Sequence, residues 1–234
     1  MNKKKILCVI PARGGSKGIQ YKNVKDLNGK PLIAYTIDIA RQIFKDDDIC
    51  VTTDDEKIVK VVENLGLYVP FIRPAHLGTD YATSQDVLRH ALNFYEQKEL
   101  LYDIILLLQP TSPFRLKRHI EEAIDLYKDT CDMVVSVKES SANPYYNLFE
   151  EDEFGYLHVS KGKGNFTRRQ DAPTVWEYNG SIYVINSMSL KQYDMSDFLN
   201  KIKYPMENIY SIDIDTQLDW IIADNLLKDG LIAL

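Results

Sequence analysis

Short apolar runs alternate with longer segments of helical period over the first 138 residues. Compact runs of β-branched and other apolar residues are typical of buried strands, and apolar residues repeating about every three or four positions are typical of amphipathic helices. These patterns predict strands at 5–10, 48–54, 67–73, 103–109 and 132–138, and helices at 29–44, 55–66, 83–97 and 115–129. The alternation predicts an α/β fold with a mostly parallel sheet covered by helices, and ligands are expected beyond the carboxyl ends of its strands.

The pattern changes between residues 139 and 179. This segment is rich in Tyr, Asn, Gly and charged residues, and it has no long helical periodicity. Because such a stretch is too long for an ordinary loop, we interpret it as an inserted segment that packs against a second subunit. The core is then predicted to comprise 1–138 and 180–234. In its second part NGSIYVIN restores a strand, and DTQLDWIIADNLL forms a closing helix.

Composition and charge argue against several classes of function. The net charge of −6 opposes broad electrostatic binding to nucleic acid. No apolar run reaches the roughly 20 residues of a membrane span, and the first apolar stretch is too short for a signal peptide, so a cytoplasmic location is expected. Cys8, Cys50 and Cys131 are odd in number, widely spaced and next to apolar residues. We therefore expect reduced packing residues and neither a disulfide nor a zinc site.

One loop concentrates positive charge and glycine. IPARGGSKGIQYKN follows the first predicted strand and contains Arg13, Lys17 and Lys22. It matches neither the P-loop pattern GxxxxGK[ST] nor the dinucleotide fingerprint GxGxxG. Its glycines allow the backbone to bend around an anion, and its cations can neutralise a polyphosphate. A phosphate cradle is one interpretation, and a solvated basic turn, which is favoured for such a loop taken alone, is the other.

Two carboxylates lie close together in SIDID, near the end of the chain. In an extended segment the side chains of Asp213 and Asp215 project from the same face, which suits an oxygen-preferring Mg²⁺ ion. Taken alone, the sequence favours a simpler role for Asp215 as the N-cap of the following helix. Capping and metal binding use different oxygens, so the two interpretations are compatible.

Seven separated blocks resemble one family in the expected order. They are IPARGGSKGIQYKN, LNGKPLIAYTI, RPAHLGTDYATS, LLQPTSPFR, RRQDAP, YNGSIYV and SIDIDTQLDW. Together they resemble the cytidylyltransferases that activate nonulosonic acids, the CMP-N-acylneuraminate (CMP-sialic acid) synthetases, from Ile10 to Trp220. The resemblance implies a Rossmann-like, GT-A-like nucleotidyltransferase fold and a homodimer formed through the inserted segment. It also implies Mg²⁺ dependence and transfer of CMP from CTP to the anomeric hydroxyl of a nine-carbon sugar acid.

The resemblance also implies roles for individual residues. The implied catalytic residues are Arg13, Lys22 and Asp215, and the implied metal ligands are Asp213 and Asp215. The implied nucleotide-binding residues are Arg13, Gly14, Gly15, Lys17, Lys22, Asn23, Arg73, Ala82 and Ser84, with Arg73 and the backbone of 82–84 at cytosine. The implied sugar-acid-binding residues are Gln109, Arg168, Arg169, Gln170, Tyr178 and Asn179.

Some of these residues have structural alternatives. Ser84 is also a candidate N-cap for the helix that begins at Gln85. Arg168 and Arg169 have the alternative of a solvated basic turn, and Tyr178 and Asn179 that of packing at a dimer interface. One departure from the family pattern is GIQYKN, where many relatives have a proline, so we expect a less rigid loop before Lys22. For Arg115 we favour a structural role over pairing with a phosphate.

Three functions from different classes stay open. The preferred one is a CMP-sugar acid synthetase, in which the sugar hydroxyl attacks the α-phosphorus in line and the protein positions anions without a covalent nucleophile. The second is another nucleotidyltransferase, such as a 3-deoxy-manno-octulosonate cytidylyltransferase or a molybdopterin enzyme. The third is a non-catalytic nucleotide-binding homologue. Sialic, legionaminic and pseudaminic acids differ in small substituents that the sequence does not distinguish.

Overall fold

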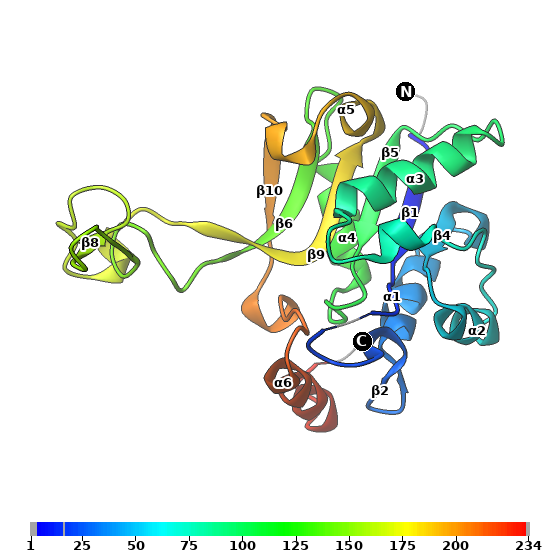
Figure 1. Cartoon of the computed structure of the whole chain (residues 1–234), viewed down its shortest axis with the longest axis horizontal. Helices are drawn as coiled ribbons and strands as arrows, with labels where there is room; N and C mark the ends of the chain where they lie inside the picture. Colours follow the sequence, from blue (N-terminus) through cyan, green and yellow to red (C-terminus); the bar gives the residue numbers. More distant parts are fainter. Residues whose placement is uncertain (1–3, 16, 233–234) are drawn as a thin grey trace.

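A six-stranded sheet forms the centre of the computed structural model, which describes residues 4–15 and 17–232 (Figure 1). The strand order is β10-β6-β9-β5-β1-β4. Its strands are β1 (Ile6–Pro11), β4 (Ile49–Thr52), β5 (Ile104–Leu108), β6 (Met133–Glu139), β9 (Trp176–Asn186) and β10 (Lys201–Pro205). The pairs β1–β4, β1–β5 and β6–β10 are parallel, whereas β9 runs antiparallel to both β5 and β6. The prediction of a mostly parallel sheet is confirmed.

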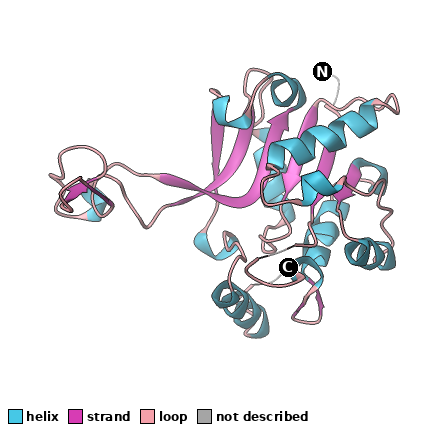
Figure 2. Ribbon diagram, viewed as in Figure 1, coloured by secondary structure: helices cyan, strands magenta, loops and turns pink. Residues whose placement is uncertain are grey.

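Helices cover both faces of the sheet (Figure 2). They are α1 (Leu32–Arg41), α2 (Glu56–Asn64), α3 (Ser84–Glu96), α4 (Lys117–Asp125), α5 (Ser187–Gln192) and α6 (Gln217–Lys228). Alternate residues of β1 point to opposite sides, so Cys8 and Ile10 pack with α1, α2 and α4, and Leu7 and Val9 pack with α3 and α5. A third apolar cluster joins α6 to the loop after β1. Cys8, Cys50 and Cys131 are buried in the core, which agrees with their expected role in packing.

The remaining elements are short. Two small antiparallel pairs are formed by β2 (Asp26–Leu27) with β3 (Lys30–Pro31), and by β7 (Phe149–Glu151) with β8 (Leu157–Val159). Single 3-10 turns lie at Lys22–Val24, Asp46–Asp48, Ala75–Gly78, Arg169–Asp171, Met195–Asp197 and Asn208–Tyr210. Among residues 4–15 and 17–232, no helix has the length and apolar character needed to cross a bilayer.

The sheet places a crevice at the end of β1. The chain continues from β1 to β4 on one side of it, and later enters β5 on the other side. Neighbouring parallel strands whose connections diverge in this way leave an opening beyond their carboxyl ends, which is where open α/β sheets bind ligands. The glycine-containing loop begins at this point.

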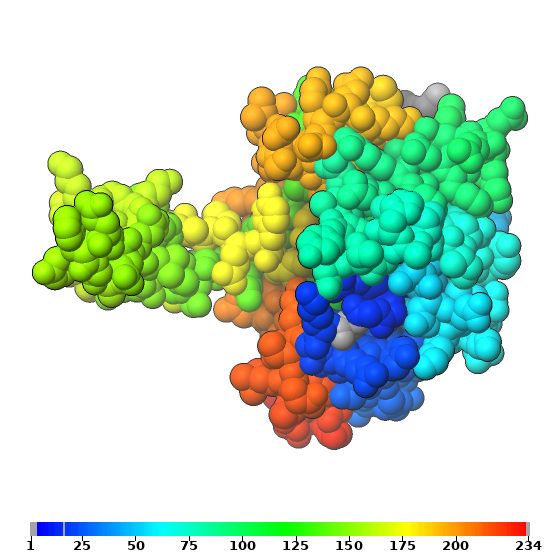
Figure 3. Space-filling model, viewed as in Figure 1, coloured from blue at the N-terminus to red at the C-terminus, as the bar shows by residue number. Residues whose placement is uncertain are grey.

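Between β6 and β9 the chain leaves the body as a long arm (Figures 1 and 3). The pairing of β6 with β9 continues outward through Val137↔Tyr178, Lys138↔Glu177 and Glu139↔Trp176, after a register shift next to Val135. The tip contains β7, β8 and several large apolar side chains that are exposed, namely Leu148, Phe149, Phe154, Tyr156 and Leu157. The arm lies within the stretch 139–179, and the interpretation of that stretch as an inserted dimerisation segment stays a prediction.

Three local predictions are wrong. The expected strand at 67–73 is reduced to a single bridge between Thr53 and Ile72. Ser84 does not cap α3, because Thr83 accepts the hydrogen bond from the Asp86 backbone and forms a capping box with that residue. Asp215 does not cap α6 either, because Thr216 and Asp219 form the equivalent box one residue later.

Candidate active site

A cleft of about 520 Å³ opens beyond the carboxyl ends of β1 and β5. Its walls come from segments within 11–23, 73–87, 109–111 and 213–215, which are far apart in the sequence. It collects ten of the residues predicted for the site, namely Arg13, Lys17, Lys22, Asn23, Arg73, Ala82, Ser84, Gln109, Asp213 and Asp215. Most of the predicted constellation therefore lies in one place.

The loop after β1 forms one wall. Arg13 and Lys17 both reach Asp80 on the opposite wall, with N–O distances of 2.7 and 2.8 Å. Gly18 lies very close to the extended segment that contains Asp215. An added Cβ at Gly18 would lie 2.0 Å from the carbonyl oxygen of Asp215. No other residue type fits there. Gly14 and Gly15 lie beside the cleft and are not among its lining residues in the described part of the chain.

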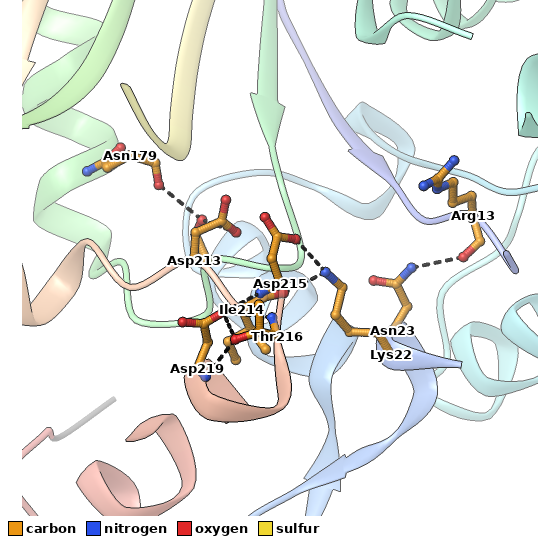
Figure 4. Close-up of polar contacts among 10 residues, drawn as sticks. Arg13, Lys22, Asn23, Asn179, Asp213, Ile214, Asp215, Thr216 and Asp219 are labelled. Atoms are coloured by element: carbon orange, nitrogen blue, oxygen red, sulfur yellow. Dashed lines mark hydrogen bonds and ion pairs between the residues drawn. The ribbon is translucent and has the colours of Figure 1, made fainter. Parts of the chain in front are cut away.

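Lys22 connects this loop to the acidic segment (Figure 4). Its side chain is buried, and its Nζ donates to the carbonyl oxygen of Ile214 at 2.5 Å and to Oδ1 of Asp215 at 2.8 Å. Asn23, next in the chain, donates from Nδ2 to the carbonyl oxygen of Arg13 at 3.1 Å. The 3-10 turn Lys22–Val24 thus fixes both a cation and the backbone of the loop.

Asp213 and Asp215 are neighbours in the cleft, although their segment is extended chain and not a strand (Figure 4). Burial and the nearby charge of Asp215 raise the pKa of the Asp213 carboxyl above its ordinary value. Asp215 has a largely exposed side chain. A buried carboxylate beside a second one is destabilised by repulsion, which a bound cation would relieve. Within the described ranges, no three His, Cys, Asp or Glu side chains form a ready-made metal site.

A glycine on β9 leaves space for the side chains of Asp213 and Gln109. Gly180 has φ +71°, and a Cβ there would lie 2.9 Å from Oδ2 of Asp213 and 3.1 Å from Oε1 of Gln109. The side chains of Asp213 and Gln109 therefore both lie against the backbone of Gly180, where a larger residue would displace them. Arg115 holds this region in place from the protein interior. Its buried guanidinium donates to the carbonyl oxygen of Gln109 and to the hydroxyl of Ser181. This is the structural role expected for Arg115.

The predicted cytosine end contains a buried arginine. The side chain of Arg73 is 3% exposed, and its Nη2 donates to Oδ1 of Asp54 at 3.0 Å. The same oxygen accepts from the backbone N–H of Gly14 at 3.3 Å, so Asp54 joins the two walls of the cleft. The Nε of Arg73 is buried and has no partner among the described residues.

The structure does not bring the other predicted sugar-acid residues into this cleft of the same chain. Arg169 and Gln170 line a separate hollow of about 280 Å³ on the arm, and Arg168 is paired with Asp171 at 2.8 Å. Tyr178 is half exposed on β9. The amide of Asn179 is buried and satisfied by the hydroxyls of Ser136 and Ser211 at 2.6 and 2.9 Å. Its side chain is therefore a packing element of the core.

Three residues of this site were missed by sequence reasoning. Asp54 and Asp80 looked like ordinary loop carboxylates, and their partners, Arg73 and the two cations of the loop, are distant in the sequence. Gly180 stands in a segment that reads as a continuous strand, and only its positive φ shows why a glycine is there. An isolated glycine inside a strand pattern is the one local signal that was present.

Comparison with known proteins gives relatives over nearly the whole chain. A CMP-N,N′-diacetyllegionaminic acid synthase of Legionella pneumophila is 34% identical over 237 aligned positions, covering 96% of this chain and 97% of its own length. An N-acylneuraminate cytidylyltransferase of Streptococcus agalactiae is 38% identical over 221 positions, covering 93% of this chain and 52% of its own length.

The fold has a counterpart among solved structures. The CMP:2-keto-3-deoxy-manno-octonic acid synthetase, solved in complex with CTP, superposes with a TM-score of 0.69 over 97% of this chain and 99% of its own. Its sequence identity is 17%, so this likeness concerns the fold. The family model described as cytidylyltransferase matches residues 7–227. With relatives above 30% identity along its length, the chain belongs to the cytidylyltransferase family.

Proposed function

We propose that this protein transfers CMP from CTP to the anomeric hydroxyl of a nonulosonic acid, a nine-carbon sugar acid, and releases pyrophosphate. The observation that carries the proposal is the cleft that brings Arg13, Lys17 and Lys22 together with Asp213 and Asp215. A triphosphate needs the cations, and a divalent metal ion needs the carboxylates. The names of the two relatives above specify acids of this class. Because CTP is the donor, we place the reaction in the cytoplasm.

The two ends of the cleft suit the two ends of CTP. We assign the cytosine to the end with Arg73 and the backbone of 82–84, where a buried guanidinium still has a free donor. Hydrogen bonds at a buried site reject a base that leaves them unpaired. The β- and γ-phosphates then lie beside the positively charged side chains of Arg13 and Lys17. These two side chains face the wall that contains Asp80.

The reaction forms one bond and breaks another at phosphorus. The anomeric hydroxyl oxygen attacks the α-phosphorus in line, its proton passes to solvent, and the bond from that phosphorus to the bridging oxygen of the β-phosphate breaks. Negative charge grows on the departing pyrophosphate, where Arg13 and Lys22 offset it. Gln109, at the end of β5, supplies an amide with both donor and acceptor for the sugar acid.

We further propose that Asp213 and Asp215 hold Mg²⁺ during the reaction. The raised pKa of Asp213 beside a second carboxylate is what a pair of metal ligands is expected to show without its cation. When bound, the ion supplies charge stabilisation at the α-phosphate. Two protein carboxylates would leave the remaining coordination positions of the ion to phosphate and water oxygens. Lys22, which pairs with Asp215 at 2.8 Å in this structure, would then be available to the phosphates.

The arm suggests how Arg168, Arg169 and Gln170 take part. They lie on the arm, outside the cleft of the same chain, so we propose that two copies form a homodimer and that each arm reaches the other copy's sugar-acid site. The exposed apolar residues at the tip suit such an interface. An Arg fork meets a sugar carboxylate with two parallel bonds.

The dimer is tested by changing the tip. We expect the unmodified protein to have a mass near twice 27.0 kDa by light scattering at micromolar concentration. The double substitution Phe154→Asp with Leu157→Asp should weaken association by about a hundredfold, because both apolar side chains would become charged in the interface. Leu199→Asp is the control, since Leu199 is equally apolar and 90% exposed on the body. A monomeric unmodified protein would refute the assembly.

The activity is tested by pyrophosphate release from CTP with sialic, legionaminic and pseudaminic acids in turn. We expect turnover with at least one acid, and CTP should be used far better than UTP. Arg73→Ala should reduce that preference by about tenfold or more, because a buried donor to the base is lost. Equal use of CTP and UTP by the unmodified protein would contradict the cytosine assignment. No pyrophosphate release with any acid would overturn the proposed function.

A further inference from the structure

Asp80 holds two cations of the phosphate loop from across the cleft. It lies in the loop between the 3-10 turn Ala75–Gly78 and α3, and it accepts from Nη1 of Arg13 at 2.7 Å and from Nζ of Lys17 at 2.8 Å. Both bonds lower the pKa of the Asp80 carboxyl, that of Lys17 being the stronger influence. One carboxylate therefore occupies the place at which two cations converge.

The other ion pairs of the cleft differ from this one. Arg73 with Asp54 is largely buried, and Lys22 is buried beneath Asp215. At Asp80 both partners are accessible, because its side chain is 41% exposed and that of Lys17 is 77% exposed. An accessible ion pair has a small net stability and is easily exchanged for another anion. Asp80 also has no capping duty, since Thr83 and Asp86 cap α3.

We propose that Asp80 competes for Arg13 and Lys17 with the β- and γ-phosphates of CTP, which depart as pyrophosphate. It pairs with Arg13 and Lys17 in the free protein, gives way to the β- and γ-phosphates of CTP, and pairs again with the cations as pyrophosphate leaves. Asp80 thereby limits how tightly the product is retained. This inference rests on the proposed function, because pyrophosphate is the product of that reaction.

The competition acts unequally on the three ligands. CTP is held by its base as well as by its phosphates, so its contacts to the base help it to displace the Asp80 carboxylate. Pyrophosphate has lost the link to the nucleotide and depends on the cations alone. CMP has no β- or γ-phosphate and does not reach Arg13 or Lys17. Asp80 therefore lowers the affinity for pyrophosphate more than it lowers the affinity for CTP.

The test uses inorganic pyrophosphate without added metal, titrated by calorimetry into the unmodified protein and Asp80→Asn. Asparagine keeps the shape and removes the charge. We expect the Kd for pyrophosphate to fall about three- to tenfold at low ionic strength, and the difference to shrink at high salt because exposed charges are screened. The Kd for CMP should be unchanged. During turnover, Asp80→Asn should show correspondingly stronger inhibition by pyrophosphate.

Two further variants separate direct pairing from a general change of charge. Asp38→Asn removes the same charge from an exposed pair with Lys30 outside the cleft, and pyrophosphate binding should not change. In a Lys17→Met background, the effect of Asp80→Asn should fall by about half, because one of the two paired cations is gone. An unchanged or weaker affinity of Asp80→Asn for pyrophosphate would overturn the proposal and make Asp80 a scaffold for the cations. These titrations measure binding without turnover. A negative result in them can therefore be distinguished from a failure of the proposed function.

Discussion

Replacing Asp215 by asparagine is expected to lower kcat by about a hundredfold or more while the melting temperature changes little. In the role proposed for it, the carboxylate supplies charge to a hard cation at the reacting phosphate, and its loss would remove several kcal/mol of transition-state stabilisation. Stability should hold because α6 is capped by Thr216 and Asp219. The asparagine oxygen can still accept from Lys22, whose Nζ also keeps the carbonyl of Ile214.

The measurement pairs thermal melting with turnover at saturating CTP, sugar acid and Mg²⁺. Asp38→Asn is the matched control, since Asp38 is also paired with a lysine, at 2.7 Å, and is outside the cleft. It should leave kcat and melting within experimental error of the unmodified protein. If Asp215→Asn retained nearly full activity, Asp215 would be only the ion-pair partner of Lys22, and the metal would need another ligand.

Removing the buried guanidinium of Arg115 is expected to have the largest effect on stability. Arg115 is 1% exposed and donates to Oγ1 of Thr36 at 3.0 Å, to Oγ of Ser181 at 3.1 Å and to the carbonyl of Gln109. Burial lowers the pKa of Arg115 to about 9, which still leaves it charged at neutral pH. Arg115→Ala leaves these acceptors unpaired beside a cavity, and we expect the free energy of unfolding to fall by about 3 kcal/mol.

A second variant separates packing from hydrogen bonding. Arg115→Met fills most of the space without a donor or a charge, so its loss of stability should be about half that of Arg115→Ala. Arg118→Ala, on the exposed side of α4, is the control and should change the free energy of unfolding by less than about 0.5 kcal/mol. Denaturant unfolding gives all three values. Similar small losses for Ala at 115 and at 118 would show that the buried network contributes little.

The sequence predicted elements whose patterns are local and strong. The buried run of β5 and the amphipathic helices α2 and α3 have clear periods, and the structure contains them within a few residues. The segment 67–73 has β-rich composition, but Pro70 lies within it and only one bridge forms. The short edge strand β10 was not predicted, because its five residues acquire their pairing from β6 and not from an apolar pattern of their own.

The candidate site was predictable as far as motifs describe it. Cations in a glycine loop and carboxylates in SIDID were identified separately, and the fold joins them through Lys22 and Asp215, which are 193 positions apart. The partner of the two loop cations, Asp80, has no feature in the sequence that distinguishes it from a surface aspartate. Long-range pairing of this kind is fixed by the topology of the sheet, which local patterns do not contain.

The ribbon that β6 and β9 extend into the arm has a consequence for how related chains can diverge. Its side chains alternate between faces, so gaining or losing one residue in each strand beyond Val137 and Tyr178 moves the tip along the ribbon but turns it over, whereas two residues in each strand preserve its facing. Gly180 and the cleft lie on the inner side of that boundary and would be untouched. The length of the arm can thus be altered in matched steps of two residues without any change to the cleft.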